Sequence, residues 1–144
     1  MANSFLCGNQ GDEGYGIFLY DNGKKSEIKL SSSDQTELLN TVNELFKNID
    51  DEYRLYVDSE RVELIKKNDK AIEIIFDKEK AITTKSKGTI NIDRLLIPLT
   101  GDLSYDQNEN RVTILTGNPD YSGSPLISDC DDKTLVKFLK LTDK

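Results

Sequence analysis

The fold is decided by residues 16–30, which read GIFLYDNGKKSEIKL. An apolar run at residues 16–20 precedes Asn22 and Gly23, and residues 27–30 then alternate polar and apolar side chains. Asn-Gly between two such runs favours a two-residue turn, because both central residues of that turn need positive φ angles. The stretch therefore predicts a β-hairpin, with its first strand at residues 16–20 and its second strand ending at Leu30.

A helix is predicted directly after the hairpin, over about residues 34–48. Ser32 with Gln35 three residues later matches a capping box, and Asp34 and Glu37 suit the positive end of a helix dipole. The apolar residues recur at helical spacing and form one stripe, made of Leu38, Leu39, Val42, Leu45, Phe46 and Ile49. This amphipathic helix is expected to pack against the sheet.

The chain beyond residue 52 is dominated by strand patterns. Short apolar or alternating runs recur about every ten residues, at 53–57, 62–64, 71–76 and 81–84, with polar turns predicted at 58–61, 67–70 and 77–80. This spacing is typical of an antiparallel meander. The next apolar stretch, residues 90–99, contains Pro98, which predicts an edge strand or an irregular segment.

The remaining elements are shorter. Residues 5–7 are expected to form a strand followed by a glycine-rich loop at 8–16, and residues 103–105 are expected to pair with 111–115 as a hairpin. A short C-terminal helix is predicted from Asp131 or Asp132, with apolar residues from Leu135 to Leu139.

These patterns predict an α+β fold in a single domain spanning residues 1–144. We expect a mainly antiparallel sheet, a hairpin plus a meander, packed against one amphipathic helix, with a short helix at the C-terminus. No apolar run approaches 18 residues, so no membrane partner is expected. The N-terminus lacks the basic and apolar regions of a secretory signal, which favours a cytoplasmic location.

The charge of the chain is acidic and unevenly distributed. The formal net charge is −7, and residues 1–60 alone hold 12 acidic and 5 basic residues. Nucleic-acid affinity depends on Lys and Arg, so a nucleic-acid partner is not expected. An acidic surface would instead attract basic proteins and raise their association rate.

The chain contains no histidine, which removes Ser-His-Asp and Cys-His catalysis and His-ligated zinc from consideration. Cys7 and Cys130 are 123 positions apart and belong to no C-x-x-C pair, so they predict reduced thiols rather than a metal site or a redox motif. We expect no catalytic residues, no metal and no cofactor.

The segment from Asn118 to Pro125 is a candidate recognition loop, because it is rich in turn formers and has no periodicity. Tyr121 is its natural anchor, since tyrosine combines a large apolar ring with a polar tip. An ordinary surface turn explains the segment equally well.

In kind, the chain resembles the small acidic immunity proteins that bacteria pair with toxins. The resemblance rests on its size, its acidity and the absence of a catalytic apparatus. It implies tight stoichiometric binding to a cognate toxin, possibly a basic nuclease-type domain. The partner-binding residues would be Asp12, Glu13, Asp50, Asp51, Glu52, Asp58, Glu60, Tyr105, Asp120 and Tyr121.

Two other functions stay open at the level of sequence. A small carboxylate-dependent or metal-dependent enzyme would need a concave pocket lined by at least two acids. A regulatory or scaffold subunit would need a large exposed apolar patch.

Overall fold

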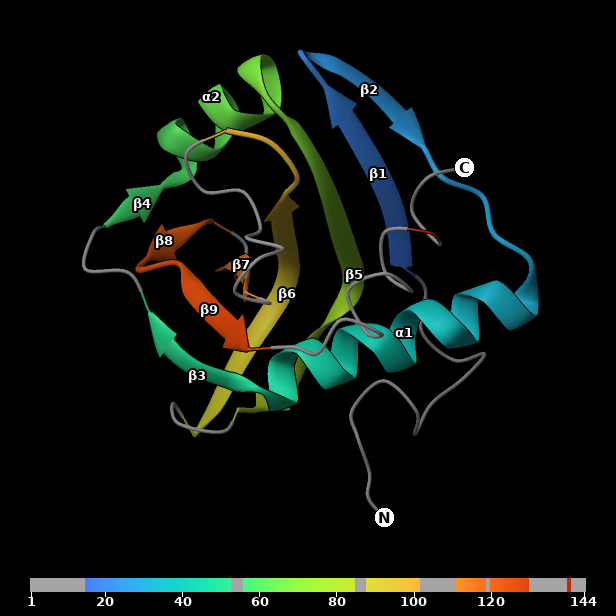
Figure 1. Ribbon diagram of the computed structural model, residues 1–144, viewed down its shortest axis with the longest axis vertical. Coiled ribbons are helices and arrows are strands. Elements are labelled where there is room, and N and C mark those ends of the chain that lie inside the picture. Colours follow the sequence, from blue (N-terminus) through green and yellow to red (C-terminus); the bar gives the residue numbers. More distant parts are fainter. Residues whose placement is uncertain are drawn as a thin grey trace.

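The protein is an antiparallel sheet with a helix on each face (Figure 1). This computed structural model describes residues 15–52, 56–84, 88–101, 111–118, 120–129 and 140. Its elements are β1 (Tyr15–Asp21), β2 (Lys24–Glu27), α1 (Ser32–Lys47), β3 (Ile49–Glu52), β4 (Val57–Asp58), α2 (Ser59–Asn68), β5 (Lys70–Thr83), β6 (Thr89–Pro98), β7 (Arg111–Gly117), β8 (Ser122–Gly123) and β9 (Leu126–Asp129).

The described strands form a seven-stranded sheet in the order β2-β1-β5-β6-β7-β9-β3, and β4 pairs separately with β8. Every pairing is antiparallel, and β5, β6 and β7 follow one another as a meander. The predicted α+β class, with its hairpin, meander and packed amphipathic helix, is confirmed.

The β1–β2 hairpin forms at the predicted turn. Asn22 and Gly23 have φ angles of 54° and 93°, as a type I′ turn requires, and Asp21 pairs with Lys24 on either side of it. The turn is held against the end of α2, because the Gly23 amide donates to the Lys66 carbonyl at 2.9 Å.

Helix α1 forms where its apolar stripe predicts, but begins two residues earlier than expected. Its N-cap is Ser31, whose side chain accepts from the Asp34 amide at 3.2 Å, so the predicted pairing of Ser32 with Gln35 is wrong. The buried residues of α1 are Leu38, Thr41, Val42, Leu45 and Phe46. The four apolar ones, Leu38, Val42, Leu45 and Phe46, join the larger apolar core, together with residues of β1, β5, β6 and β7.

Replacing the cap Ser31 with Ala is expected to lower the free energy of unfolding by about 1 kcal/mol, because the Asp34 amide loses its acceptor. Ser31→Asp keeps an acceptor at the same place and should retain most of the stability. Urea unfolding followed by far-UV circular dichroism compares the two variants. Equal stability of both variants and the parent would show that the cap does not contribute.

The region predicted as a strand through Val62 and Leu64 is instead helix α2, and the predicted turn at 58–61 is its first turn. The Asp58 side chain accepts from the Arg61 amide at 3.1 Å and caps the helix. Val62 and Ile65, three residues apart, are buried, whereas Leu64 is 50% exposed. The alternation of Val62 and Leu64 wrongly predicted a strand, because Leu64 points away from the core. With Val57, Ala71, Leu96, Leu115 and Tyr121, the two buried residues form a second core cluster.

Two expectations about the long strands are also wrong. The predicted turn at 77–80 lies inside the continuous strand β5, where the register with β6 shifts between Ile75 and Lys80 and residues 77–79 are exposed as a bulge. Strand β6 is interior rather than at an edge. Pro98 is tolerated there because it is the last residue of β6, and the ladder with β7 spans only residues 94–96.

Several predicted elements lie outside the described residues: the strand at 5–7, most of the loop at 8–16, the first arm of the 103–115 hairpin and the helix after Asp131. Among the described residues, neither α1 nor α2 is long and apolar enough to cross a bilayer.

Candidate functional site

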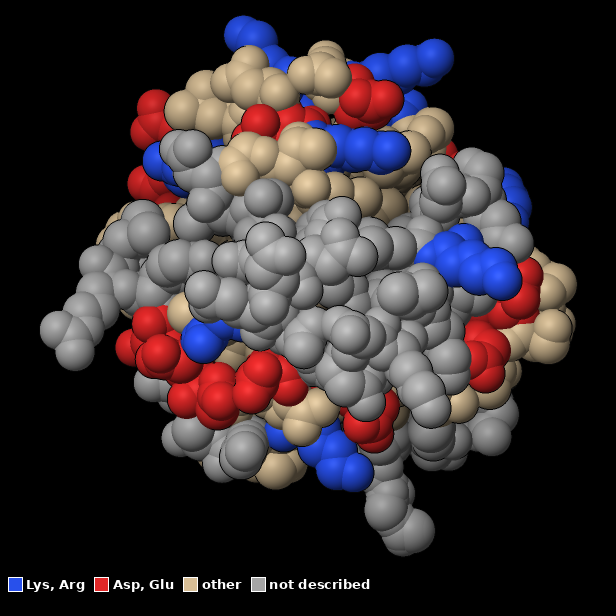
Figure 2. All heavy atoms as spheres, viewed as in Figure 1, with Lys and Arg blue, Asp and Glu red and all other residues tan. Residues whose placement is uncertain are grey.

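Asp50, Asp51 and Glu52 lie together on β3, the last strand at one edge of the sheet. Asp50 falls where the β3–β9 register shifts, and the side chains of Asp50 and Asp51 are exposed. Asp129, at the end of the neighbouring strand β9, is exposed as well. In Figure 2 acidic side chains gather at the lower left, over β3. The structure therefore places three of the predicted partner-binding residues on one edge strand of the sheet.

One cation interrupts this acidic edge. Arg111 of β7 lies 3.8 Å from Asp51 Oδ2, while Asp51 Oδ1 accepts from the Glu52 amide at 2.8 Å. Both side chains of the ion pair are partly exposed, so the pair is screened by solvent and contributes little to stability. A basic partner can therefore compete with Arg111 for Asp51.

Asp58, Glu60 and Asp120 form a second acidic group, at the start of α2. The Tyr121 amide donates to Ser59 Oγ at 3.2 Å, which brings Asp120 beside the first turn of α2. Asp58 is engaged as the helix cap, and Glu60 lies in the first turn. Three predicted site residues, Asp12, Glu13 and Tyr105, lie outside the described residues.

Tyr121 is not an exposed anchor in this conformation. Its side chain is 5% exposed, and its hydroxyl donates to Glu73 Oε2 at 2.7 Å. The surrounding segment folds back on itself, because Tyr121 bridges to Gly117 and β8 pairs with β4. The chain from 120 to 125 is therefore part of the structure that covers one face of the sheet.

Among the described residues, the exposed aromatic residue that follows these acids along the chain is Tyr56, which the sequence reasoning did not single out. It is 67% exposed and lies between the acidic strand β3 and the cap Asp58 along the chain. The signal available from sequence was its place before Val57, because successive side chains of an extended segment point to opposite sides and Val57 is buried.

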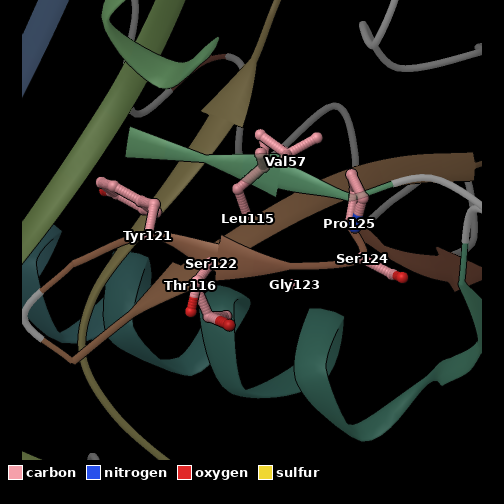
Figure 3. Close-up of a pocket in the computed structure, with 8 residues that line it drawn as sticks. All are labelled: Val57, Leu115, Thr116, Tyr121, Ser122, Gly123, Ser124 and Pro125. Carbon is pink, nitrogen blue, oxygen red and sulfur yellow. The ribbon is translucent and has the colours of Figure 1, made fainter. Parts of the chain in front are cut away.

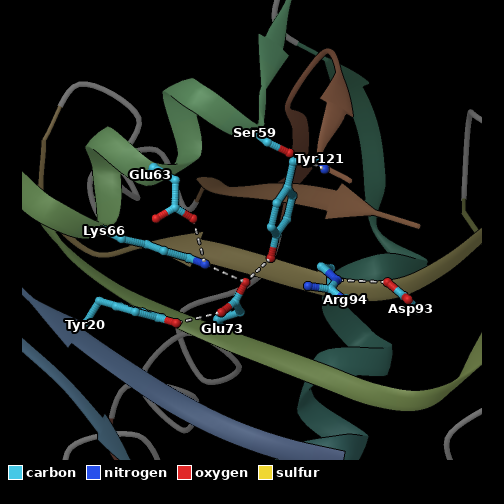
Figure 4. A network of polar contacts seen from close by, with 8 residues as sticks. All are labelled: Tyr20, Ser59, Glu63, Lys66, Glu73, Asp93, Arg94 and Tyr121. Atoms are coloured by element: carbon cyan, nitrogen blue, oxygen red, sulfur yellow. Dashed lines mark hydrogen bonds and ion pairs between the residues drawn. The ribbon is translucent and has the colours of Figure 1, made fainter. Parts of the chain in front are cut away.

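A fully buried carboxylate, Glu73 of β5, organises the contacts between the sheet and α2 (Figure 4). Glu73 Oε1 accepts from the Tyr20 hydroxyl at 3.0 Å. Glu73 Oε2 accepts from Tyr121 and lies 3.1 Å from Lys66 Nζ, which is also 3.6 Å from Glu63. Strands β1 and β5, helix α2 and the segment after β7 thus meet at one side chain.

The rings and charges around Glu73 reinforce this arrangement. Lys66 Nζ lies 4.8 Å from the ring centre of Tyr20 and 5.9 Å from that of Tyr121, within the range of cation–π attraction. Burial, followed by the charge of Glu73, raises the pKa of both tyrosines well above the usual value. The hydrogen bond to Asp93, 3.0 Å away, raises the pKa of nearby Arg94. Both hydroxyls are consequently held protonated, as donors.

Described residues line a small cavity and a larger one. One, of about 10 Å³, has room for about one water molecule and is lined by Val57, Leu115, Thr116, Tyr121, Ser122, Gly123, Ser124 and Pro125 (Figure 3). The other, of about 210 Å³, lies beside the start of α1 and contains one carboxylate, that of Glu27. Within the described part of the chain, no three acidic or cysteine side chains are grouped so as to hold a metal ion.

Comparison with known proteins returns no match: no protein-family model, no curated protein and no solved structure is similar to this chain. The function therefore has to be inferred from the residues themselves.

Proposed function

We propose that this chain is a binding protein that neutralises a cognate toxin by stoichiometric protein–protein contact through its acidic surface. The observation that carries the proposal is the acidic edge, Asp50 and Asp51 on β3 with Asp129 on β9, all three exposed. The partner that fits this edge is a basic protein surface, such as a toxin domain of nuclease type whose own active site binds phosphate.

In such an interface, the carboxylates and an exposed aromatic side chain contribute differently to the association rate and to the affinity. Exposed carboxylates steer a basic partner and raise the association rate, but contribute modestly to the affinity itself. Most of the binding energy of an interface comes from a few residues, among which tyrosine is enriched. Tyr56 takes the role expected of Tyr121, because it is exposed and lies four residues after the end of the acidic strand.

Two features favour binding over the alternatives. The small and the larger cavity above hold no carboxylate and one carboxylate respectively, whereas a carboxylate-dependent enzyme would line its cavity with at least two. The large apolar side chains that are exposed in the described residues are Tyr56 and Leu64, which do not make the broad patch of a scaffold subunit.

The first test is co-purification with the products of the neighbouring genes, at low and at high salt. We expect one basic toxin domain to be retained in a one-to-one complex that high salt weakens, and co-expression to restore growth of cells that produce the toxin. If neither neighbouring product binds and growth is not restored, the proposal is wrong.

Once the partner is purified, charge reversal tests the surface. Asp50→Lys is expected to weaken the complex by about tenfold, mainly through slower association, because the approaching basic surface is then repelled. Asp21→Lys makes the same charge change at the end of β1, far from β3 in the strand order, and should leave the affinity within about twofold. Equal effects of the two substitutions in surface plasmon resonance would place the binding surface elsewhere.

A further inference from the structure

The other edge of the sheet, β2, has a pattern that the proposed function does not use. Strand β2 reads Lys24-Lys25-Ser26-Glu27, and all four residues are exposed. In the described part of the chain it pairs only with β1, and it stands at the opposite end of the sheet from the acidic strand β3. No other described strand pairs with its outer side, which is therefore a sheet edge among the described residues.

The register with β1 decides which backbone groups face outward. Asp21 and Lys24 flank the two-residue turn, and Ile28 donates to the Ile17 carbonyl at 2.8 Å. Hydrogen-bonded pairs alternate along an antiparallel ladder, so Lys24, Ser26 and Ile28 direct their amides and carbonyls toward β1. Lys25 and Glu27 therefore direct theirs away from the sheet.

We propose that two copies of this chain pair antiparallel along β2, about a two-fold axis at Ser26. This register sets Lys25 of each copy directly opposite Glu27 of the other. Four backbone hydrogen bonds form between the outward groups of these residues, and two opposite-charge pairs lie on the same face of the joined sheet. The small side chain of Ser26 meets its own copy at the axis.

The charges of Lys25 and Glu27 favour this register over the registers with an axis at either of those residues. Only axes at Lys25, Ser26 or Glu27 keep the outward groups of the strand opposite one another. An axis at Lys25 sets two lysines face to face, and an axis at Glu27 sets two glutamates face to face. Lysine on an edge strand normally discourages pairing, but here the glutamate two residues later offsets it.

Within one copy of the chain, the contacts of Lys25 and Glu27 that compete with pairing between copies are weak. Glu27 is 3.5 Å from Lys29, and Lys25 Nζ is 4.4 Å from the ring centre of Phe18. The Glu27–Lys29 pair is exposed to solvent and is exchanged easily for a cross-strand pair. Because a four-residue edge is smaller than a standard interface, the dimer is expected to be weak, with Kd on the order of 100 µM.

The test is sedimentation velocity of the purified full chain from about 5 to about 500 µM, a range that spans the expected Kd. The parent protein should shift from monomer to dimer, and less so at high salt. Lys25→Glu and Glu27→Lys should each weaken the dimer by about tenfold, because like charges then face each other twice. The double variant Lys25→Glu/Glu27→Lys restores the opposite charges and should dimerise within about threefold of the parent.

Lys47→Glu, at the exposed end of α1, is the matched control for charge and should dimerise as the parent does. A parent that stays monomeric up to about 500 µM overturns the proposal. So does a dimer that the double variant weakens as much as the single ones. Toxin binding at β3 is measured separately, so either proposal can fail while the other stands.

Discussion

Glu73→Ala is expected to lower the free energy of unfolding by about 3–5 kcal/mol, the largest effect of any single substitution considered. The variant leaves the hydroxyls of Tyr20 and Tyr121 and the ammonium of Lys66 without the carboxylate that they share. Buried donors that lose their acceptor cost their full desolvation energy, and the removed side chain leaves a cavity as well. Urea unfolding followed by far-UV circular dichroism measures the loss.

Further variants separate the charge from the hydrogen bonds. Glu73→Gln keeps a side-chain oxygen as an acceptor and should cost less, about 1–3 kcal/mol. Glu79→Ala removes an exposed glutamate from the bulge of the same strand and should change stability by less than about 0.5 kcal/mol. A Glu73→Ala variant as stable as Glu79→Ala would show that the network does not hold the fold together.

The parts of the fold that sequence predicted correctly depend on local signals. Asn22 and Gly23 can form a type I′ turn whatever surrounds them, and the stripe from Leu38 to Phe46 can form a helix with one apolar face. Helix α2 was missed because its decisive features are a cap at Asp58 and the burial of Ile65, which a period-two reading of Val62 and Leu64 hides.

Tertiary contacts explain the other differences. The bulge in β5 replaces a predicted turn because the strand continues beside β6 on both sides of residues 77–79. Tyr121 was expected at the surface because its neighbours are turn formers, but its acceptor Glu73 lies 48 residues earlier in the chain. No local pattern reports a partner at that distance.

The acidic edge was partly predictable. Three consecutive acids after a helix, Asp50 to Glu52, had to lie at an element boundary, and the structure places them on β3. That β3 would be an edge strand depends on its pairing with β9, almost eighty residues later.

Alkaline pH is expected to destabilise the protein steeply, through Tyr20 and Tyr121. Both pKa values are raised in the folded state by burial and by the Glu73 charge, whereas in the unfolded chain a tyrosine titrates near its usual pKa of about 10. Above that pH the unfolded state loses protons that the folded state keeps. Stability is therefore fully present below pH 10 or so and falls as the pH rises further, by about 1.4 kcal/mol per pH unit for each tyrosine.

Phenylalanine variants show how much of this fall in stability with pH is due to each tyrosine. Tyr121→Phe should be less stable than the parent at pH 8, since it loses the hydrogen bond to Glu73, yet its stability should fall less steeply between about pH 10 and 11. Tyr20→Phe/Tyr121→Phe should reduce the slope further, by about 2 kcal/mol in all between pH 10 and 11 relative to the parent, because a tyrosine of the unfolded chain is only half ionised at pH 10. Urea unfolding at each pH gives the slopes, and absorbance at 295 nm reports tyrosine ionisation. Because lysines also titrate in this range, the difference between variant and parent is what counts: identical slopes would mean that neither hydroxyl is held protonated by Glu73.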